Sequence, residues 1–274
     1  MFTGRPALTL PLITLLSDFG LKDYYVAEMK AVISTIYPEA RIVDISHSIE
    51  KFNIRMGAFV LASAARYFPK GTIHVAVVDP GVGTKRRALL IETQEAFYLG
   101  PDNGLLILAA YREGILHVYQ ITKPKFLLSR LSSTFHGRDV FAPAAAHLAH
   151  GTAPRDIGSE TSDYEVPTFT KLVSKAGKLK GEVLHIDDFG NVITNIASRD
   201  LKRIDAKLKN LLKITLGDKP LKMRFCTTYR DVTDKSMLAL IGSHDFLEIA
   251  VNQGDASKKL RTKAGDAITI SVER

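Results

Sequence analysis

The residues best suited to chemistry lie in the stretch "AVVDPGVGTKRR" (76–87), where an apolar run ends at Asp79 and is followed by two glycines and then Arg86. A phosphate-binding loop would need a Gly-Lys-Ser/Thr ending that opens a helix, or three glycines at fixed spacing. This stretch has neither, and a strand-like segment follows it. A carboxylate beside a guanidinium stays ionised, and together the two groups can position a water molecule. The stretch therefore indicates either a carboxylate with an arginine partner or a tight turn.

Other acids and one histidine are candidates for the same site. Asp18 in "LLSDFG" and Asp44 in "IVDIS" also follow apolar runs, and His136 in "STFHGRDVFAP" precedes a predicted helix. An Asp after a strand commonly caps a helix or orders a turn, and we prefer that interpretation for Asp44. Glycines beside Asp18 and Asp79 would let a ligand approach the backbone, which favours a functional role. His147 and His150 have no carboxylate nearby, so no metal site is predicted.

Polar residues also gather between strands in the second half of the chain. In "HIDDFGNVITNI", Asp187, Asp188 and Asn191 interrupt two apolar segments, and these residue types are typical of a hairpin turn. "GSHDFLEIAVNQG" is similar, because Ser243 and His244 fall at a turn and Glu248 in a strand. Taken alone, both segments are interpreted as turns.

The elements that must position these residues change character along the chain. In residues 1–160, strand-like segments such as "LITLLS", "RIVDIS" and "TIHVAVVD" alternate with helix-like segments such as "YYVAEMKAVISTIY" and "GRDVFAPAAAHLAH", while "ALLIET" and "AFYLG" resemble a hairpin. This alternation predicts an α/β domain with a largely parallel central sheet. Ligands of such sheets bind beyond the carboxyl ends of the strands.

The rest of the chain predicts a different fold. Residues 161–179 are polar and aperiodic and are interpreted as a linker, whereas residues 180–274 contain short strands separated by turns. That spacing predicts a smaller C-terminal antiparallel β-barrel domain, with a sandwich as the alternative.

Composition narrows the function classes. The net charge of +8 is spread over both halves, and the lysine-rich stretches lack interleaved aromatic residues, so nucleic-acid binding is not expected. The single cysteine, Cys226, cannot form an intrachain disulfide and favours a reducing, cytoplasmic location. No apolar run is long enough to span a membrane, and "ALTLPLITLL" is interpreted as a first buried strand rather than a signal peptide.

Six motifs in order resemble one family over nearly the whole chain. These are "LLSDFG…DYYVAEMKAV", "VVDPGVGTKR", "YLGPDNGLL", "STFHGRDVFAPAAAHLA", "DDFGNVITNI" and "LEIAVNQG". They are similar to motifs of the S-adenosyl-L-methionine (SAM) hydroxide adenosyltransferases, which are related to fluorinases and chlorinases. The resemblance implies an α/β domain followed by a β-barrel, and a homotrimer that binds SAM between subunits. It also implies hydrolysis of SAM to adenosine and L-methionine without any cofactor.

The resemblance also implies roles for individual residues. Asp79, Arg86 and His136 match the set that positions or activates water, and Asp18 matches the carboxylate that binds the ribose hydroxyls. Asp187 (or its neighbour Asp188) and Asn191 match groups that hold the methionine end. The other residues implied in substrate binding are Phe19, Asp23, Phe52, Asn103, Ser243, His244 and Glu248.

The implied chemistry is physically reasonable for these residue types. A sulfonium departs as a neutral thioether, so the leaving group needs no acid, and the main requirement is an oriented nucleophile. Two alternatives remain at this point: a SAM-dependent halogenase, and a protein that binds SAM or adenosine without catalysis. The halogenases lack the Asp of "VVDPGVG", which favours water as the nucleophile.

Overall fold

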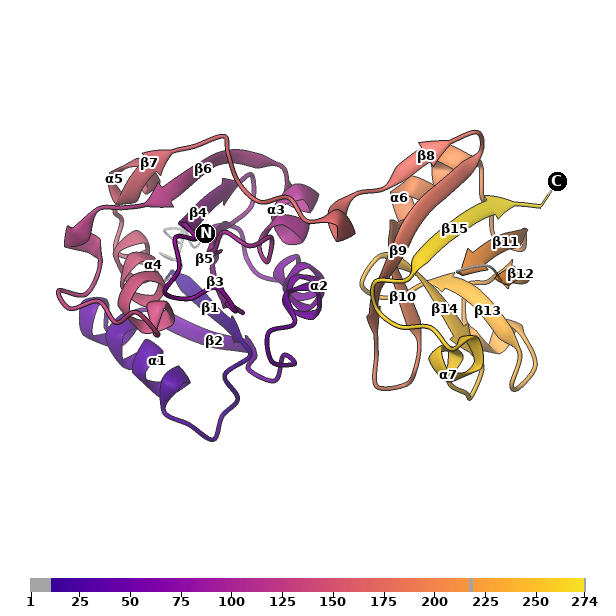
Figure 1. Cartoon of the computed structure of the whole chain (residues 1–274), viewed down its shortest axis with the longest axis horizontal. Coiled ribbons are helices and arrows are strands. Elements are labelled where there is room, and N and C mark those ends of the chain that lie inside the picture. Colours follow the sequence, from indigo (N-terminus) through magenta and orange to yellow (C-terminus); the bar gives the residue numbers. More distant parts are fainter. Residues whose placement is uncertain (1–10, 217–218, 274) are drawn as a thin grey trace, which may run out of the picture. The chain divides into compact units, whose positions relative to one another are not determined.

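The computed structural model describes residues 11–216 and 219–273. The chain divides into two compact units between Val166 and Pro167, and each is described separately. Figure 1 shows an α/β unit built by the first part of the chain and a unit made mainly of strands built by the rest.

The first unit contains a seven-stranded sheet. Its strand order is β2 (Arg41–Ser46), β1 (Leu12–Ser17), β3 (Ile73–Val77), β5 (Phe97–Pro101), β4 (Ala88–Thr93), β6 (Ile115–Ile121) and β7 (Gly158–Glu160). The pairs β1–β2, β1–β3 and β3–β5 are parallel, and β4, β6 and β7 continue the sheet in antiparallel pairs. The predicted α/β fold is confirmed, and so is the predicted hairpin of β4 and β5.

Helices cover both faces of this sheet (Figure 1). Helices α1 (Tyr25–Ile36) and α4 (Ala142–Ala149) pack together on one face, and their side chains share a core with Ile13, Leu15 and Val75 of the strands. Helices α2 (Ile54–Ala65) and α3 (Ile107–Glu113) pack together on the other face. The short elements of this unit are α5 (Pro154–Ile157), a 3₁₀ turn (Pro124–Phe126) and a π-helical turn (Gly137–Phe141).

Three loops follow the carboxyl ends of the parallel strands. Residues 18–24 join β1 to α1, residues 47–53 join β2 to α2, and residues 78–87 join β3 to β4. Asn53 caps the start of helix α2: its side chain accepts a hydrogen bond from the Met56 amide and so fixes the end of the second loop. A fourth segment, residues 127–136, leads into the π-helical turn before α4.

The second unit is a closed barrel of seven strands. The order is β10 (Val192–Ala197), β14 (Phe246–Val251), β13 (Met237–Ile241), β12 (Lys219–Phe225), β11 (Leu211–Leu216), β15 (Ala267–Val272) and β9 (Lys178–Ile186), and a β9–β10 pairing closes it. The barrel was predicted as antiparallel, but β12 and β13 are parallel. Residues 226–236 connect them, and a connection of that length can return to the same barrel end, which a two-residue hairpin cannot.

Short elements complete the second unit. They are β8 (Val173–Lys175), which pairs with β9, helices α6 (Ser198–Leu201) and α7 (Ala256–Leu260), and 3₁₀ turns at Thr168–Thr170, Lys202–Ile204 and Tyr229–Asp231. The region interpreted as a linker, residues 161–179, thus includes β8. Cys226 is buried.

The segment "ALTLPLITLL" falls partly outside the described residues, and its described part enters β1 at Leu12. Across residues 11–216 and 219–273, no helix has the length and apolar character needed to cross a membrane.

Candidate functional site

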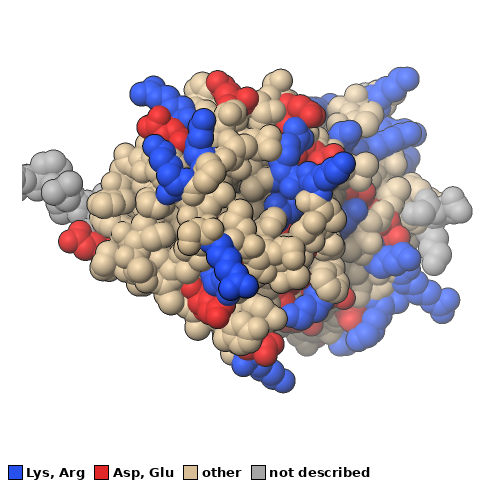
Figure 2. Space-filling model, turned by 60° about the vertical axis from the view of Figure 1, so that its left-hand side comes forward, with Lys and Arg blue, Asp and Glu red and all other residues tan. Residues whose placement is uncertain are grey.

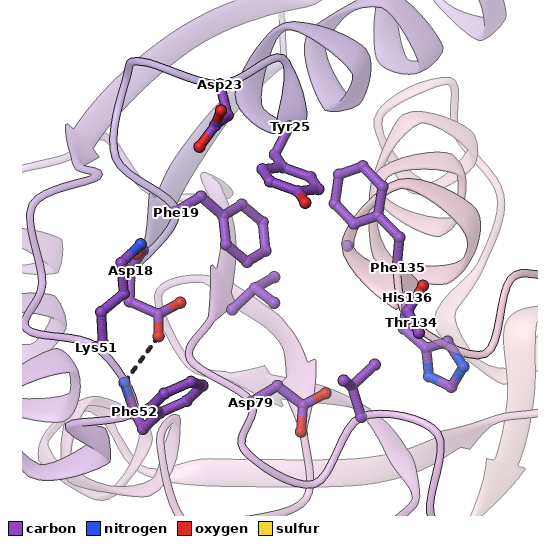
Figure 3. Close-up of a pocket in the computed structure, with 13 residues that line it drawn as sticks. Asp18, Phe19, Asp23, Tyr25, Lys51, Phe52, Asp79, Thr134, Phe135 and His136 are labelled. Carbon is purple, nitrogen blue, oxygen red and sulfur yellow. Dashed lines mark hydrogen bonds between the residues drawn. The ribbon is translucent and has the colours of Figure 1, made fainter.

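A cavity of about 360 Å³ opens at the carboxyl ends of β1 and β3 (Figure 3). Segments from all four loop regions contribute to its wall. The lining residues are Asp18, Phe19, Asp23, Tyr25, Lys51, Phe52, Val77, Asp79, Val82, Thr134, Phe135, His136 and Gly137. The position agrees with the rule for ligand sites in open parallel sheets.

Asp79, Arg86 and His136 form a connected group at this cavity. Asp79 Oδ2 accepts hydrogen bonds from Arg86 Nε at 2.9 Å and Nη2 at 2.5 Å, while Arg86 Nη2 lies 2.7 Å from His136 Nδ1. The side chains of Asp79 and Arg86 are only 5% and 9% exposed. Charge-assisted hydrogen bonds in such a buried pair are short and directional, so the pair holds the carboxylate in one orientation.

The contact with Arg86 fixes the protonation form of His136. An arginine side chain only donates hydrogen bonds, so His136 Nδ1 must be the acceptor and the neutral ring carries its proton on Nε2. Burial and the neighbouring Arg86 charge both lower the pKa of His136, which favours this neutral form. The Nδ1 lone pair is therefore already used by Arg86.

The second oxygen of Asp79 is different. Oδ1 is buried and has no hydrogen-bond partner among the described residues. A buried carboxylate oxygen without a partner is costly, and native structures rarely leave one without a functional reason. Asp79 lines the cavity, so its carboxylate borders the space that a small molecule can occupy, and Oδ1 keeps an acceptor position that no described residue uses.

Asp18 and Phe52 lie on the opposite side of the cavity from His136 (Figure 3). Asp18 Oδ2 accepts a hydrogen bond from the Phe52 amide at 2.9 Å, and Lys51 Nζ donates to the Asp18 carbonyl oxygen. Phe52 has a φ of 64° and a 67% exposed residue surface. The Asp18 carboxylate thus helps to hold a non-glycine residue in a left-handed backbone conformation beside the cavity.

An aromatic cluster forms a further part of the wall. The ring centroids of Phe19, Tyr25 and Phe135 lie 5.0–5.7 Å apart, with Phe135 edge-on to the other two rings. The sequence predicted Phe19 and also Asp23, which lines the cavity, but it missed Tyr25, Lys51, Val82, Thr134 and Phe135. These residues lie in or directly beside the loop segments of the predicted site residues, and this proximity in the sequence could have identified them.

Gly83 brings the loop of Asp79 against the segment that carries His136. Its φ is +79°, and a Cβ atom there would lie 2.5 Å from the Ser133 carbonyl oxygen. Gly81 has no such requirement, because a Cβ atom there would meet nothing closer than 3.6 Å. Of the two glycines in "DPGVGT", only Gly83 lies at a position whose backbone conformation and close neighbour require glycine.

Replacing Gly83 with Ala is expected to lower the free energy of unfolding by about 2 kcal/mol or more, because left-handed strain of about 1–2 kcal/mol adds to a backbone clash. Urea unfolding measures the loss. Gly177→Ala is the control for strain alone, since Gly177 also has a positive φ but open space around it. Equal losses in Gly83→Ala and Gly177→Ala would contradict the close approach to Ser133.

Four other sequence candidates take different positions. The Asn103 side chain donates to the Val78 carbonyl oxygen and accepts from the Leu105 amide, so it joins two backbone segments and does not line the cavity. Asp44 lies inside β2 and pairs with Lys30. His147 and His150 pack on the rings of Phe126 and Tyr37, and no group of three possible metal ligands occurs within the described parts of the chain.

The remaining candidates lie in the second unit. Asp187 accepts hydrogen bonds from the Asn191 amide and side chain in the β9–β10 turn, which confirms the hairpin predicted there. His244 lies 3.3 Å from Glu248, and Glu248 accepts a hydrogen bond from the Tyr229 hydroxyl at 2.7 Å. Ser243 lies in the turn between β13 and β14.

This unit has a cavity of its own, of about 470 Å³. It is lined by Phe189, Asn191, Tyr229, Val251, Gln253 and Gly254. Phe189 is 80% exposed, which is unusual for a large apolar side chain. The sequence did not single out Phe189 or Tyr229, although Phe189 lies within the motif "DDFGN".

The distribution of charged side chains bears on the kind of ligand the surface could bind. On the face shown in Figure 2, Lys and Arg are interspersed with Asp and Glu and separated by uncharged surface. This distribution fits a solvated exterior better than the basic stripe of a nucleic-acid-binding face.

The α/β unit with its carboxylate-lined cavity, followed by a small barrel, defines the class of protein. The chain belongs to the SAM hydroxide adenosyltransferase family: residues 13–158 match the N-terminal domain and residues 181–269 the C-terminal domain of that family.

Individual relatives are similar over nearly their full lengths. An (R)-S-adenosyl-L-methionine hydrolase of Methanocaldococcus jannaschii is 38% identical over 95% of this chain and 96% of its own. A fluorinase of Nocardia brasiliensis is 28% identical over 96% of this chain and 97% of its own. The crystal structure of an uncharacterized conserved protein from Thermotoga maritima has a TM-score of 0.85 at 40% identity, over 94% of this chain and 99% of that one.

Proposed function

We propose that this protein is an enzyme that hydrolyses SAM to adenosine and L-methionine. The observation that carries the proposal is the carboxylate of Asp79, a residue that lines the cavity: Oδ1 is buried and has no hydrogen-bond partner among the described residues, while Oδ2 is fixed by Arg86. A water molecule that donates to Oδ1 would be held in one orientation. The family and its curated hydrolase relatives support SAM as the substrate.

In this reaction the water oxygen attacks the ribose C5′ and the C5′–S bond breaks. The bonding electrons go to sulfur, which leaves as the neutral thioether of methionine, and the attacking water gives up one proton to the surrounding water as the alcohol forms. Holding water in line with the breaking bond supplies much of the rate, because positioning alone can remove several kcal/mol from the barrier. Desolvation of the cationic sulfonium in a partly apolar cavity assists a small nucleophile.

The residues divide between catalysis and substrate binding. Asp79 orients the water, Arg86 orients Asp79, and His136 holds Arg86 through Nδ1. Asp18, whose second carboxylate oxygen points into the cavity (Figure 3), binds the ribose hydroxyls. Phe19, Asp23 and Phe52 complete this part of the substrate site, and Asn103 supports the loop behind it.

The second unit supplies the other substrate contacts in this proposal, through Asp187, Asn191, Ser243, His244 and Glu248. The protein forms a homotrimer, and the second unit of one subunit completes the cavity of another. Polar turn residues together with an exposed Phe189 support a ligand-binding role for this unit. The trimer is tested by light scattering of the purified protein. A cytoplasmic location belongs to the same proposal and is supported by the single free cysteine.

Product chromatography tests the proposed function directly. Purified protein with SAM in halide-free buffer is expected to release adenosine and methionine in equal amounts. The name of the Methanocaldococcus jannaschii hydrolase specifies the R configuration, so the two sulfonium epimers are supplied separately. A 5′-halo-nucleoside formed only when halide is added would indicate a halogenase. Binding of SAM without any product would indicate a non-catalytic protein, and either result would overturn the proposal.

The pH profile tests the role of His136. Because the pKa of His136 is lowered, its Nδ1 remains an acceptor for Arg86 below pH 6.5, the usual midpoint for histidine. We therefore expect kcat/KM to stay level from pH 8 to pH 6.5 and to fall only at lower pH. His136→Asn offers an amide oxygen in place of Nδ1. In this variant, the fall in kcat/KM at low pH that is caused by protonation of His136 should disappear. A midpoint above 6.5 in the wild type would contradict the assignment.

A further inference from the structure

A second chain of polar side chains runs behind the Asp18 side of the cavity. Ser17 Oγ and His47 Nδ1 are 2.7 Å apart, and His47 Nε2 lies 3.2 Å from Asp44 Oδ1, off the direction of a good hydrogen bond. Asp44 Oδ2 in turn accepts from Lys30 Nζ at 2.6 Å. The chain joins a surface ion pair to a serine that is 0% exposed at the end of β1.

This order of residues resembles the serine, histidine and aspartate of a nucleophilic triad. The side chain of Ser17 has no accessible surface, and it does not line the cavity, so it cannot reach a substrate. The geometry therefore favours a structural role, in which Ser17 and His47 hold the loop of residues 18–24 that follows β1.

One assignment of protons gives the buried Ser17 hydroxyl an acceptor. The Phe19 amide donates to Ser17 Oγ at 3.3 Å, so the Ser17 hydroxyl proton is free to donate to His47 Nδ1. With Nδ1 as the acceptor, the ring proton of His47 lies on Nε2, facing the Asp44 carboxylate. The opposite tautomer would leave the buried Ser17 hydroxyl proton without an acceptor among the described residues, which costs free energy.

His47 also holds the same loop through its backbone. Its carbonyl oxygen accepts from the Gly20 amide at 2.8 Å, and Gly20 has a φ of +74°. The residues on either side of Phe19 are thus fixed as well, because Asp18 is bound by Lys51 and the Phe52 amide. The loops that follow β1 and β2 are joined at four points around Asp18.

We propose that Ser17 and His47 are positioning residues, which hold the segment Asp18–Gly20 in the conformation that binds substrate. The inference rests on the proposed function, in which Asp18 binds the ribose. Without the Ser17–His47 bond the segment would sample other conformations, and the apparent affinity would fall by the fraction of molecules that remain competent. Asp79 and Arg86 lie on another loop and keep their own bonds. The effect should therefore appear in KM and not in kcat.

The experiment measures kcat, KM and adenosine affinity for four variants. Ser17→Ala and His47→Leu are expected to raise KM and the Kd of adenosine about tenfold while kcat stays within about twofold. His47→Asn, whose amide oxygen replaces Nδ1 as the acceptor, is expected to restore most of the loss. Ser63→Ala is the matched control, because Ser63 Oγ is also buried but has no hydrogen-bond partner among the described residues. It should behave as the wild type does.

The outcomes separate this inference from the proposed function. If the wild type releases adenosine but Ser17→Ala keeps the wild-type KM and adenosine affinity, the positioning role is wrong. The same holds if kcat falls while KM is unchanged, or if His47→Asn is as impaired as His47→Leu. If the wild type releases no adenosine, the proposed function is wrong, and adenosine binding by calorimetry still tests the effect of Ser17 and His47 on the loop.

Discussion

The Asp79→Asn variant is expected to lose about 10²- to 10³-fold in kcat with little change in KM. The amide preserves the shape of the side chain and could still accept from Arg86. At the other position it presents either a donor or a neutral oxygen where Oδ1 now offers a charged acceptor for water. Losing a preorganised polar group that acts mainly in the transition state typically costs this much in kcat. The rate of adenosine release at saturating SAM measures it.

Asp163→Asn is the control for the Asp79 prediction. Asp163 also pairs with an arginine, Arg87, at 2.9 Å, but its side chain is 88% exposed and does not line the cavity. Its kcat should match that of the wild type. Wild-type kcat in a correctly folded Asp79→Asn protein would show that water is not held by Asp79.

Acid is expected to destabilise the first unit through His74. This residue is 0% exposed in β3, its ring stacks on Tyr98, and its Nδ1 lies 2.7 Å from the Thr14 hydroxyl. Burial lowers the pKa of His74 to about 3, whereas in the unfolded chain it is near 6.5. The unfolded state therefore binds a proton first as pH falls.

The sign and size follow from proton linkage. The contribution of His74 to stability is complete above pH 6.5 and declines as pH falls from 6.5 towards 3. The slope is about 1.4 kcal/mol per pH unit and the total is on the order of 5 kcal/mol. Urea unfolding at several pH values measures this slope.

A double variant isolates the contribution of His74. In Thr14→Val/His74→Phe both hydrogen-bonding partners are replaced by apolar groups, so neither substitution removes the partner of a polar group that stays behind at the other position. Between pH 6 and pH 4, we expect the free energy of unfolding of the double variant to decrease less steeply than that of the wild type. The difference between the two slopes should be about 1.4 kcal/mol per pH unit. His150→Gln, a replacement of an exposed histidine, is the control. An unchanged slope in the double variant would show that His74 does not titrate on unfolding.

Much of the architecture follows from local patterns in the sequence. Alternating strands and helices predicted the α/β unit, and the acids after β1 and β3 could be assigned to one sheet edge because parallel strands end there together. The parallel pairing of β12 with β13 could not be predicted in this way. Which strands pair with one another depends on how the barrel closes, and it cannot be predicted from the residue types within a single strand.

The details of the site depend on contacts between segments far apart in sequence. Arg86 and His136 are 50 residues apart, so spacing alone could suggest a carboxylate with an arginine but not that the arginine also determines the histidine tautomer. Asp44 was expected to cap a helix or to order a turn, yet it takes part in the Ser17–His47 chain because β1 and β2 are neighbours. Such links depend on tertiary structure.

The position of Arg86 has a consequence for the movement of protons. Its Nη2 atom contacts both Asp79 and His136, one hydrogen directed to each. A guanidinium neither takes up nor releases a proton under ordinary conditions, so Arg86 cannot relay a proton between the Asp79 carboxylate and the His136 imidazole. A proton cannot pass along the shortest path between them and must leave through water. The group of Asp79, Arg86 and His136 therefore suits a nucleophile that is held in place and not deprotonated before it attacks. Water and small anions both meet this requirement.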